Sequence, residues 1–213
     1  MTIKTRIKAI TPPWLWERMH RLRSWHGVRR GRQEVARYPA RVVEHTYAGV
    51  PLRIEIADPT ASVWYDENWN GVTEFKEVSF LKGHRLRTGA RVFDLGAHQC
   101  VMALILADVV GPTGSVVAVE AHPHNARVAG KNRELNRADN LTVVHAAVAD
   151  RAGTIVINEA LNAKVDDRGS FGRIEVEAIT IDDLAARHGT PDVAMIDIEG
   201  YEVHALRGMR HVL

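Results

Sequence analysis

Two short apolar segments of the sequence each deliver a carboxylate at their end. Asp94 lies near the end of the segment 91–95, and Glu120 closes the segment 115–120. Short, mostly apolar segments of this kind are typical of parallel strands that are buried on both faces. Ligands of open α/β sheets bind beyond the carboxyl ends of the strands. Two acids placed there would suit a ligand that carries a cationic ammonium group and a ribose diol.

The turn after the first segment distinguishes between ligands of this kind. Dinucleotide-binding sites carry the pattern Gly-x-Gly-x-x-Gly, whose glycines leave room for a pyrophosphate. Here only the first glycine, Gly96, is present, and His98 stands at the second position. This disfavours a nicotinamide cofactor and an oxidoreductase, and it is compatible with S-adenosylmethionine, which has no pyrophosphate. Glu120 follows Gly96 at close to the ~20-residue spacing expected of a ribose-binding acid.

A third acidic group follows the apolar segment 193–197. Asp197 and Glu199 should line the crevice beside the first strand, where an acceptor hydroxyl would meet the methyl group of the cofactor. A carboxylate there could accept the hydroxyl proton or orient the oxygen for in-line displacement. Alternatively, these acids cap the following helix. His98 is the best histidine candidate for a base, and the histidines lack the spacing of metal ligands, so no metal is predicted.

Strands and helices alternate through the part of the sequence that carries these residues. The alternation predicts right-handed βαβ units in a Rossmann-like parallel sheet with helices on both faces. The expected strands are 91–95, 115–120, 141–145 and 193–197, and the expected helices are 99–109, 123–136, 181–188 and 201–212. Residues 154–157 and 174–178 predict an antiparallel pair around a polar loop at 158–173.

Upstream of this sheet, residues 42–65 have the pattern of weak strands with a turn at 48–49, and residues 74–87 predict a helix. We therefore divide the chain into an arm, residues 1–41, and a domain, residues 42–213. The predicted sheet ends at its fourth strand with an open edge. We expect that further strands beyond this chain complete the domain, or that a partner, such as a second copy in a homodimer, covers the edge.

The composition is that of a soluble globular protein. With 213 residues, 46% of them hydrophobic and 25% charged, the chain is large enough to bury a substantial core. The single cysteine, Cys100, excludes an internal disulfide and suits a reducing compartment. No apolar run approaches the roughly 20 residues that a membrane span needs. We therefore expect a cytoplasmic protein.

Basic residues are concentrated in the arm, which contains eleven Lys and Arg against two Glu, whereas the rest of the chain is net acidic. Leu15, Met19, Leu22 and Trp25 recur at helical spacing and predict an amphipathic helix. Either this helix packs on the domain, or its tryptophan and arginine side chains contact the inner membrane surface. No base-reading module accompanies the arginines, so no nucleic-acid partner is predicted.

Several segments, taken together and in order, resemble the FkbM family of S-adenosylmethionine-dependent methyltransferases. They are 92–97, 117–120, 146–150, 180–184, and 196–202 with 206–208. The resemblance covers roughly residues 50–213. It implies a class I methyltransferase fold that O-methylates a hydroxyl of a sugar, glycan or secondary metabolite, so that a small-molecule or glycan acceptor is the implied partner.

The resemblance also implies a set of cofactor-binding residues. Asp94, Gly96 and Glu120 match cofactor positions of the family, and Ala147 and Asp150 lie where the adenine is expected. The residues that adjoin these positions complete the predicted set, namely Ala97, His98, Ala121 and Asp197.

The sequence departs from the family pattern in several places. The family commonly has Asn and then Gly where His98 and Cys100 stand, and a lysine is frequent where Met195 stands. The family also continues into further strands after the final helix. These departures leave open an alternative from another class of protein, a non-catalytic S-adenosylmethionine-binding or scaffolding domain.

Overall fold

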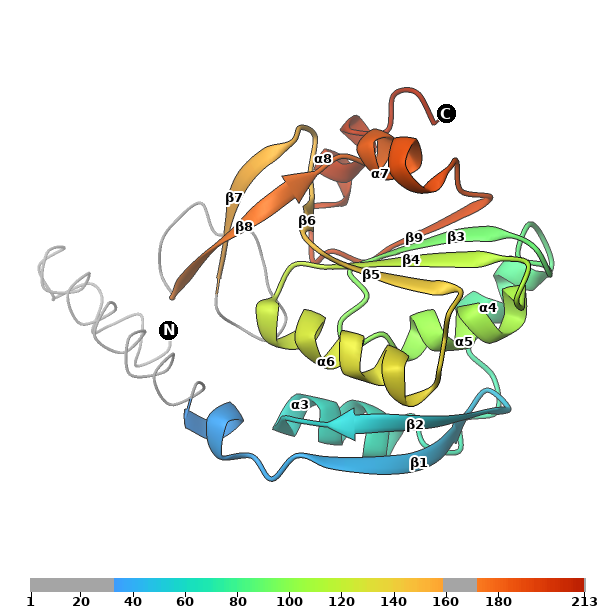
Figure 1. Ribbon diagram of the computed structural model, residues 1–213, viewed down its shortest axis with the longest axis vertical. Coiled ribbons are helices and arrows are strands. Elements are labelled where there is room, and N and C mark those ends of the chain that lie inside the picture. Colours follow the sequence, from blue (N-terminus) through green and yellow to red (C-terminus); the bar gives the residue numbers. More distant parts are fainter. Residues whose placement is uncertain (1–32, 159–171, 213) are drawn as a thin grey trace, which may run out of the picture.

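The computed structural model describes residues 33–158 and 172–212 of the chain. At its centre lies a parallel sheet with the strand order β5-β4-β3-β9 (Figure 1). Its strands are β3 (Arg91–Leu95), β4 (Ser115–Glu120), β5 (Leu141–His145) and β9 (Val193–Ile196). The predicted α/β fold with a parallel sheet is confirmed, and β3 and β9 are neighbours, as expected for the first and fourth strands of the alternation.

Both faces of this sheet are buried, because successive residues of a strand point to opposite sides. In β3, Val92 belongs to the core on one side, while Phe93 and Leu95 belong to the core on the other. In the same way, β4 contributes Val116 to the first core and Val117 to the second. Strands that are apolar on both faces produce continuous apolar runs, which is why the sequence pattern identified them.

Helices cover the two faces of the sheet (Figure 1). α5 (Val101–Val110) and α6 (Pro123–Leu135) pack on one face, and α7 (Ile181–His188) and α8 (Glu202–Arg207) on the other. Outside α5 and α6 lies the antiparallel pair β1 (Arg41–Tyr47) and β2 (Val50–Ile56). Asn132 of α6 joins these layers, because its side chain accepts the Glu55 N–H at 2.7 Å and donates to the Gln99 carbonyl at 2.9 Å.

A second, smaller sheet has the order β6-β8-β7. β7 (Gly153–Asn158) and β8 (Arg173–Ile179) run antiparallel, which confirms the predicted pair. β6 (Ala147–Val148) pairs with β8 in parallel and was not predicted, because two residues are too few to show a periodic pattern. This sheet follows directly from the end of β5 and brings apolar side chains close to the tips of the central strands.

The prediction of weak strands through residue 65 is wrong after β2. Residues 59–68 are helical, with α3 (Pro59–Ala61) leading into the π-helix η1 (Ser62–Asn68). Asp58 caps this segment, because its side chain accepts the Ala61 N–H at 2.8 Å. Pro59 occupies the first turn, where its missing N–H leaves no hydrogen bond unmade. The cap and the proline start a helix where the apolar pattern indicated a strand.

Other helices are shorter than predicted. α4 (Lys76–Lys82) ends at Gly83 rather than at residue 87. α8 ends at Gly208 rather than near residue 212. A β-carbon at Gly208 would lie 2.3 Å from the carbonyl oxygen of Ala149, so only glycine permits this close packing after the helix. α5 begins at Val101 rather than at residue 99, because Cys100 has a φ of +65°.

The amphipathic helix predicted within the arm lies outside the described residues, whose first helical stretch is 33–37. Most of the predicted polar loop 158–173 also lies outside them. Among the residues that are described, no helix combines the length and the apolar character required to cross a bilayer.

Gly96 determines how closely β3 and β9 approach each other at their ends. It has a φ of +94°, and a β-carbon there would lie 1.9 Å from the carbonyl oxygen of Asp197. We expect Gly96→Ala to lower the free energy of unfolding by more than about 2 kcal/mol, because strain and a backbone clash add. Urea denaturation followed by circular dichroism measures this change.

Gly130→Ala is the matched control for that substitution. Gly130 lies within α6 with open space around it, so the alanine variant should gain about 0.5–1 kcal/mol from its better helix propensity. Equal effects of the two substitutions would contradict the role of Gly96.

Candidate active site

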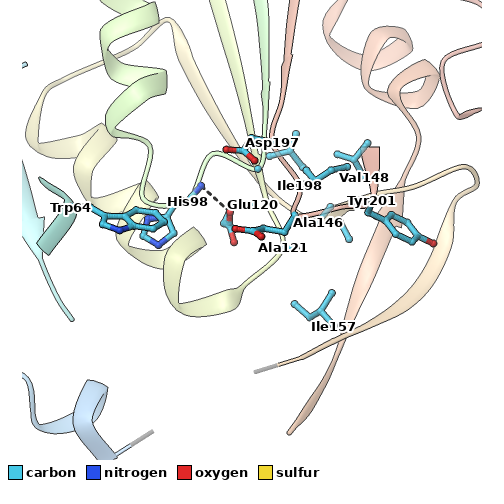
Figure 2. A pocket seen from close by; sticks show the side chains of 14 residues that line it. Trp64, His98, Glu120, Ala121, Ala146, Val148, Ile157, Asp197, Ile198 and Tyr201 are labelled. Atoms are coloured by element: carbon cyan, nitrogen blue, oxygen red, sulfur yellow. Dashed lines mark hydrogen bonds between the residues drawn. The ribbon is translucent and has the colours of Figure 1, made fainter. Parts of the chain in front are cut away.

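A cleft opens at the carboxyl ends of β3, β4 and β9 (Figure 2). Together with the solvent-filled space at its open mouth it comprises about 700 Å³. Gly96, Glu120 and Asp197 line it, together with Glu199. The strand tips that the sequence analysis singled out therefore meet at one place.

Glu120 lies in the middle of the cleft wall and is 6% exposed. Its Oε2 accepts the backbone N–H of His98 at 2.9 Å, and its Oε1 accepts that of His122 at 2.8 Å. Glu120 also accepts hydrogen bonds from the side chain of Asn125 and from the backbone N–H of Ala121. Burial raises the pKa of Glu120 to about 7, although these hydrogen bonds favour its ionised form.

Asp94 lies behind the cleft wall rather than on it. It is 3% exposed, and its Oδ2 has no hydrogen-bond partner in the described part of the chain. Burial, followed by the neighbouring charges of Glu120 and Asp197, raises the pKa of Asp94 to about 7. The described residues that line the cleft include no Lys or Arg. The described part of the site therefore concentrates carboxylates, and a cationic ligand would complement their charge.

The turn after β3 holds three residues in the left-handed backbone region. Gly96, His98 and Cys100 have φ values of +94°, +49° and +65°. Asn and Gly adopt this region at lower cost than other residues, which gives a physical reason for the Asn and Gly of the family pattern. This chain forms the turn with bulkier residues. Burial raises the pKa of the Cys100 thiol far above its usual range, so the thiol remains protonated.

An aromatic cluster that the sequence analysis did not identify holds the side chain of His98. The hydroxyl of Tyr65, a residue only 2% exposed, lies 2.7 Å from Nδ1 of His98. The rings of Trp64 and His98 lie with their centroids 5.0 Å apart. Burial lowers the pKa of His98 to about 4, and Nε2 is enclosed without a hydrogen-bond partner among the described residues. His98 is therefore neutral and poorly placed to take a proton from an acceptor.

A second buried network, also missed from the sequence, fixes the segment that carries this cluster. Asp58 is fully buried and accepts hydrogen bonds from Nε2 of Gln99 at 2.6 Å and Nε2 of His124 at 2.9 Å. Burial opposes its ionisation, but hydrogen bonds from His124, Ala61 and Gln99 hold the pKa of Asp58 below its usual value. Asp58 thereby ties the start of α3 to the N-terminal ends of α5 and α6.

Asp197 and Glu199 line the cleft on the β9 side and remain candidates for contact with the acceptor. The alternative prediction, that they cap the following helix, is not what the structure shows. Tyr201 is the N-cap of α8, and the carboxylate of Glu202 accepts the Gly200 N–H at 2.9 Å. Glu199 itself has a φ of +56°, a conformation that places backbone strain at the cleft wall.

The remaining predicted cofactor residues divide into two groups. Ala121 and Ala147 line the cleft, whereas Ala97 and Asp150 are not part of its lining. Ala97 packs into the core, and Asp150 lies with its Oδ2 3.9 Å from Nδ1 of His204. In the described ranges, no group of His, Cys, Asp and Glu side chains has the arrangement of a metal site.

A parallel sheet with a single-glycine turn and carboxylates at its strand tips is the architecture of a class I methyltransferase. Residues 94–213 match the family described as the Methyltransferase FkbM domain. The chain belongs to this family, whose members are S-adenosylmethionine-dependent methyltransferases, and the predicted family is thereby confirmed. No curated protein matches the sequence.

Several solved structures are similar to parts of the chain. Methyltransferase FkbM from Methylobacillus flagellatus KT shares 19% identity over 62% of this chain and 32% of its own, with a TM-score of 0.46. A SAM-dependent methyltransferase from Aquifex aeolicus shares 21% identity over 42% of each chain, with a TM-score of 0.32. Aeropyrum pernix fibrillarin, with natively bound S-adenosyl-L-methionine, shares 21% identity over 52% of this chain and 41% of its own, with a TM-score of 0.31. The chain thus spans about a third of the length of the Methylobacillus protein.

The raised pKa of Asp94 makes the stability of the ligand-free protein depend on pH. Its pKa is about 7 in the folded protein against an ordinary 3.8, so folding favours the protonated form. The stability that this proton contributes is complete below the ordinary pKa and is lost as the pH rises through 7. We expect Asp94→Asn to be more stable than the wild type, by a margin that grows by about 2–3 kcal/mol between pH 5 and pH 8.

Urea denaturation of the ligand-free protein at several pH values measures that margin. Asp139→Asn is the control, because Asp139 is an exposed loop carboxyl away from the cleft. A margin for Asp94→Asn that stays constant with pH, or matches that of the control, would refute the assignment.

Proposed function

We propose that the protein transfers a methyl group from S-adenosylmethionine to a hydroxyl oxygen of a sugar, glycan or secondary metabolite. The observation that carries the proposal is the group of buried carboxylates at the strand tips. Glu120 lines the cleft and Asp94 lies behind it, and both have pKa values raised to about 7. A ligand with a sulfonium and an ammonium group would supply positive charge to a cleft whose described lining includes no Lys or Arg.

The shape of the cleft also suits this cofactor. Glu120, on the cleft wall, would pair with the ribose hydroxyls through charge-assisted hydrogen bonds. Beside it, Ala147, Val148 and Ile157 form an apolar wall suited to an adenine ring. Asp94 has an oxygen without a hydrogen-bond partner among the described residues, and its negative charge acts on the amino-acid end of the site.

The remaining residues of the cleft would act on the acceptor. When bound, S-adenosylmethionine supplies an electrophilic methyl group, so the chain mainly has to align the oxygen and exclude water. Asp197 and Glu199 are the carboxylates on the wall that can hold the acceptor hydroxyl and take up its proton. His98 is the weaker candidate, because its ring is enclosed and burial lowers its pKa to about 4.

Binding of S-adenosylhomocysteine tests the first half of the proposal. We expect Glu120→Ala to weaken binding about 10- to 100-fold, because charge-assisted hydrogen bonds to the ribose would be lost. Isothermal titration calorimetry measures the change. Asp183→Ala is the matched control, since Asp183 also binds backbone and hydroxyl donors but lies in the capping box of α7, away from the cleft.

The pH dependence of binding provides an independent check. Protonation of Asp94 and Glu120 below pH 7 removes the negative charge that attracts the sulfonium. S-adenosylmethionine should therefore bind more weakly at pH 6 than at pH 8, and should lose more affinity than S-adenosylhomocysteine, which lacks the sulfonium charge. If the wild-type protein binds neither compound, the proposal is refuted.

An assay of methyl transfer tests the second half of the proposal, the transfer to a hydroxyl oxygen. With methyl-labelled S-adenosylmethionine and a panel of methyl glycosides, the label should enter a product as an ether methyl that survives alkali, whereas a methyl ester would be hydrolysed. Glu199→Gln and Asp197→Asn should each lower kcat more than they raise KM. Cofactor binding without transfer to any acceptor would favour the scaffolding alternative instead.

A further inference from the structure

The cleft has two chemically different ends, with Glu120 between them (Figure 2). On one side lie Val148, Ile157 and Tyr201, and on the other lie Trp64 and His98. In the proposed function the adenine occupies the apolar side and the ribose pairs with Glu120. The side formed by Trp64 and His98 then lies beyond the ribose, where the amino-acid end of the cofactor and the reacting partner would meet.

The position of Trp64 is set by a backbone irregularity. It lies in the π-helix η1, where the N–H of Trp69 reaches the carbonyl of Trp64 at 2.8 Å. The wider turn lets neighbouring residues take different roles, because Tyr65 is buried in the core while Trp64 is half-buried at the cleft. Short π-helical stretches occur frequently at functional sites.

The ring behind Trp64 is fixed in orientation. The hydroxyl of Tyr65 accepts a hydrogen bond from the backbone N–H of Gln99 and lies within hydrogen-bond distance of Nδ1 of His98, 2.7 Å away. His98 thus supports the indole as an uncharged ring, with the two centroids 5.0 Å apart and the planes inclined by 42°.

The residues that hold His98 and Trp64 in place are themselves fixed by hydrogen bonds to the rest of the fold. The backbone N–H of His98 is bound by Glu120, and the segment that carries Trp64 begins at the buried Asp58. Trp64 is therefore held from both sides by residues that also shape the cofactor turn. An aromatic surface held in this way is ready to bind a ring without first being ordered.

We propose that Trp64 is the specificity-determining residue for the acceptor, and that His98 and Tyr65 position its indole so that the acceptor ring packs on it. This inference rests on the proposed function. An indole packs on the apolar C–H face of a sugar ring, while Asp197 and Glu199 on the cleft wall accept hydrogen bonds from its hydroxyls. The acidic wall also disfavours acceptors that carry phosphate or carboxylate groups.

Binding of acceptors in the presence of saturating S-adenosylhomocysteine tests this role. Saturation-transfer difference NMR on a panel of methyl glycosides should show contact with ring C–H protons in the wild type. Trp64→Ala should lose most of that signal and lower kcat/KM for a methylated glycoside at least tenfold, mainly through KM. Trp64→Phe should retain most of both, because it keeps an aromatic surface.

Two further measurements separate this role from others. Val63→Ala is the matched control in the same π-helix, because Val63 is 45% exposed and is not part of the cleft lining. Tyr65→Phe should weaken acceptor binding by a larger factor than it weakens the calorimetric affinity for S-adenosylhomocysteine, because it removes the hydroxyl that orients the ring of His98.

Each contrary result has a distinct meaning. Unchanged glycoside contact in Trp64→Ala, or no contact in wild type that binds S-adenosylhomocysteine, would overturn the role of Trp64 and leave the proposed function standing. A loss of affinity for S-adenosylmethionine but not for S-adenosylhomocysteine would overturn it as well, because the indole would then face the sulfonium. Failure of the wild type to bind either cofactor would instead overturn the proposed function.

Discussion

The carboxylate of Glu120 holds the site together by binding two backbone N–H groups. Its oxygens accept from His98, in the turn after β3, and from His122, in the turn after β4. Two βα connections are thus joined by one side chain at the end of the central sheet. Because the donors belong to the backbone, the side chains at both positions remain free for other contacts, and the ring of His98 can join the aromatic cluster.

This arrangement has an electrostatic cost. Burial opposes the ionisation of both Glu120 and Asp94, and the charge of Glu120 further opposes that of Asp94. In a protein without a ligand such a group is a source of instability. In a protein that binds a cation, the same buried carboxylates are preorganised to attract the ligand, because they need no rearrangement to meet its charge. The same residues therefore explain both a weak point of the fold and its most specific chemistry.

Local sequence patterns were sufficient to predict part of the fold and of the site. Buried strands produce apolar runs, and acids at their ends mark the edge where ligands bind, so the positions of Glu120 and Asp197 follow from the sequence alone. The need for glycine at position 96 could not be read from the sequence, because the nearest atom that a side chain would meet is the carbonyl oxygen of the distant Asp197. Asp58 and Tyr65 were missed because their partners, Gln99, His124 and His98, are distant in the sequence. No local pattern reports such contacts, and a π-helix has no simple periodicity of its own.

The π-helix also makes the architecture modular. The segment 58–69 is continuous along the chain, begins at a buried anchor and contributes Trp64 to the cleft, whereas the tips of the central strands and the second sheet contribute most of its described lining. Related chains could exchange this one segment and alter what the cleft accepts, while the sheet and its carboxylates stay as they are. Such an exchange would replace a short peptide and leave the core unchanged.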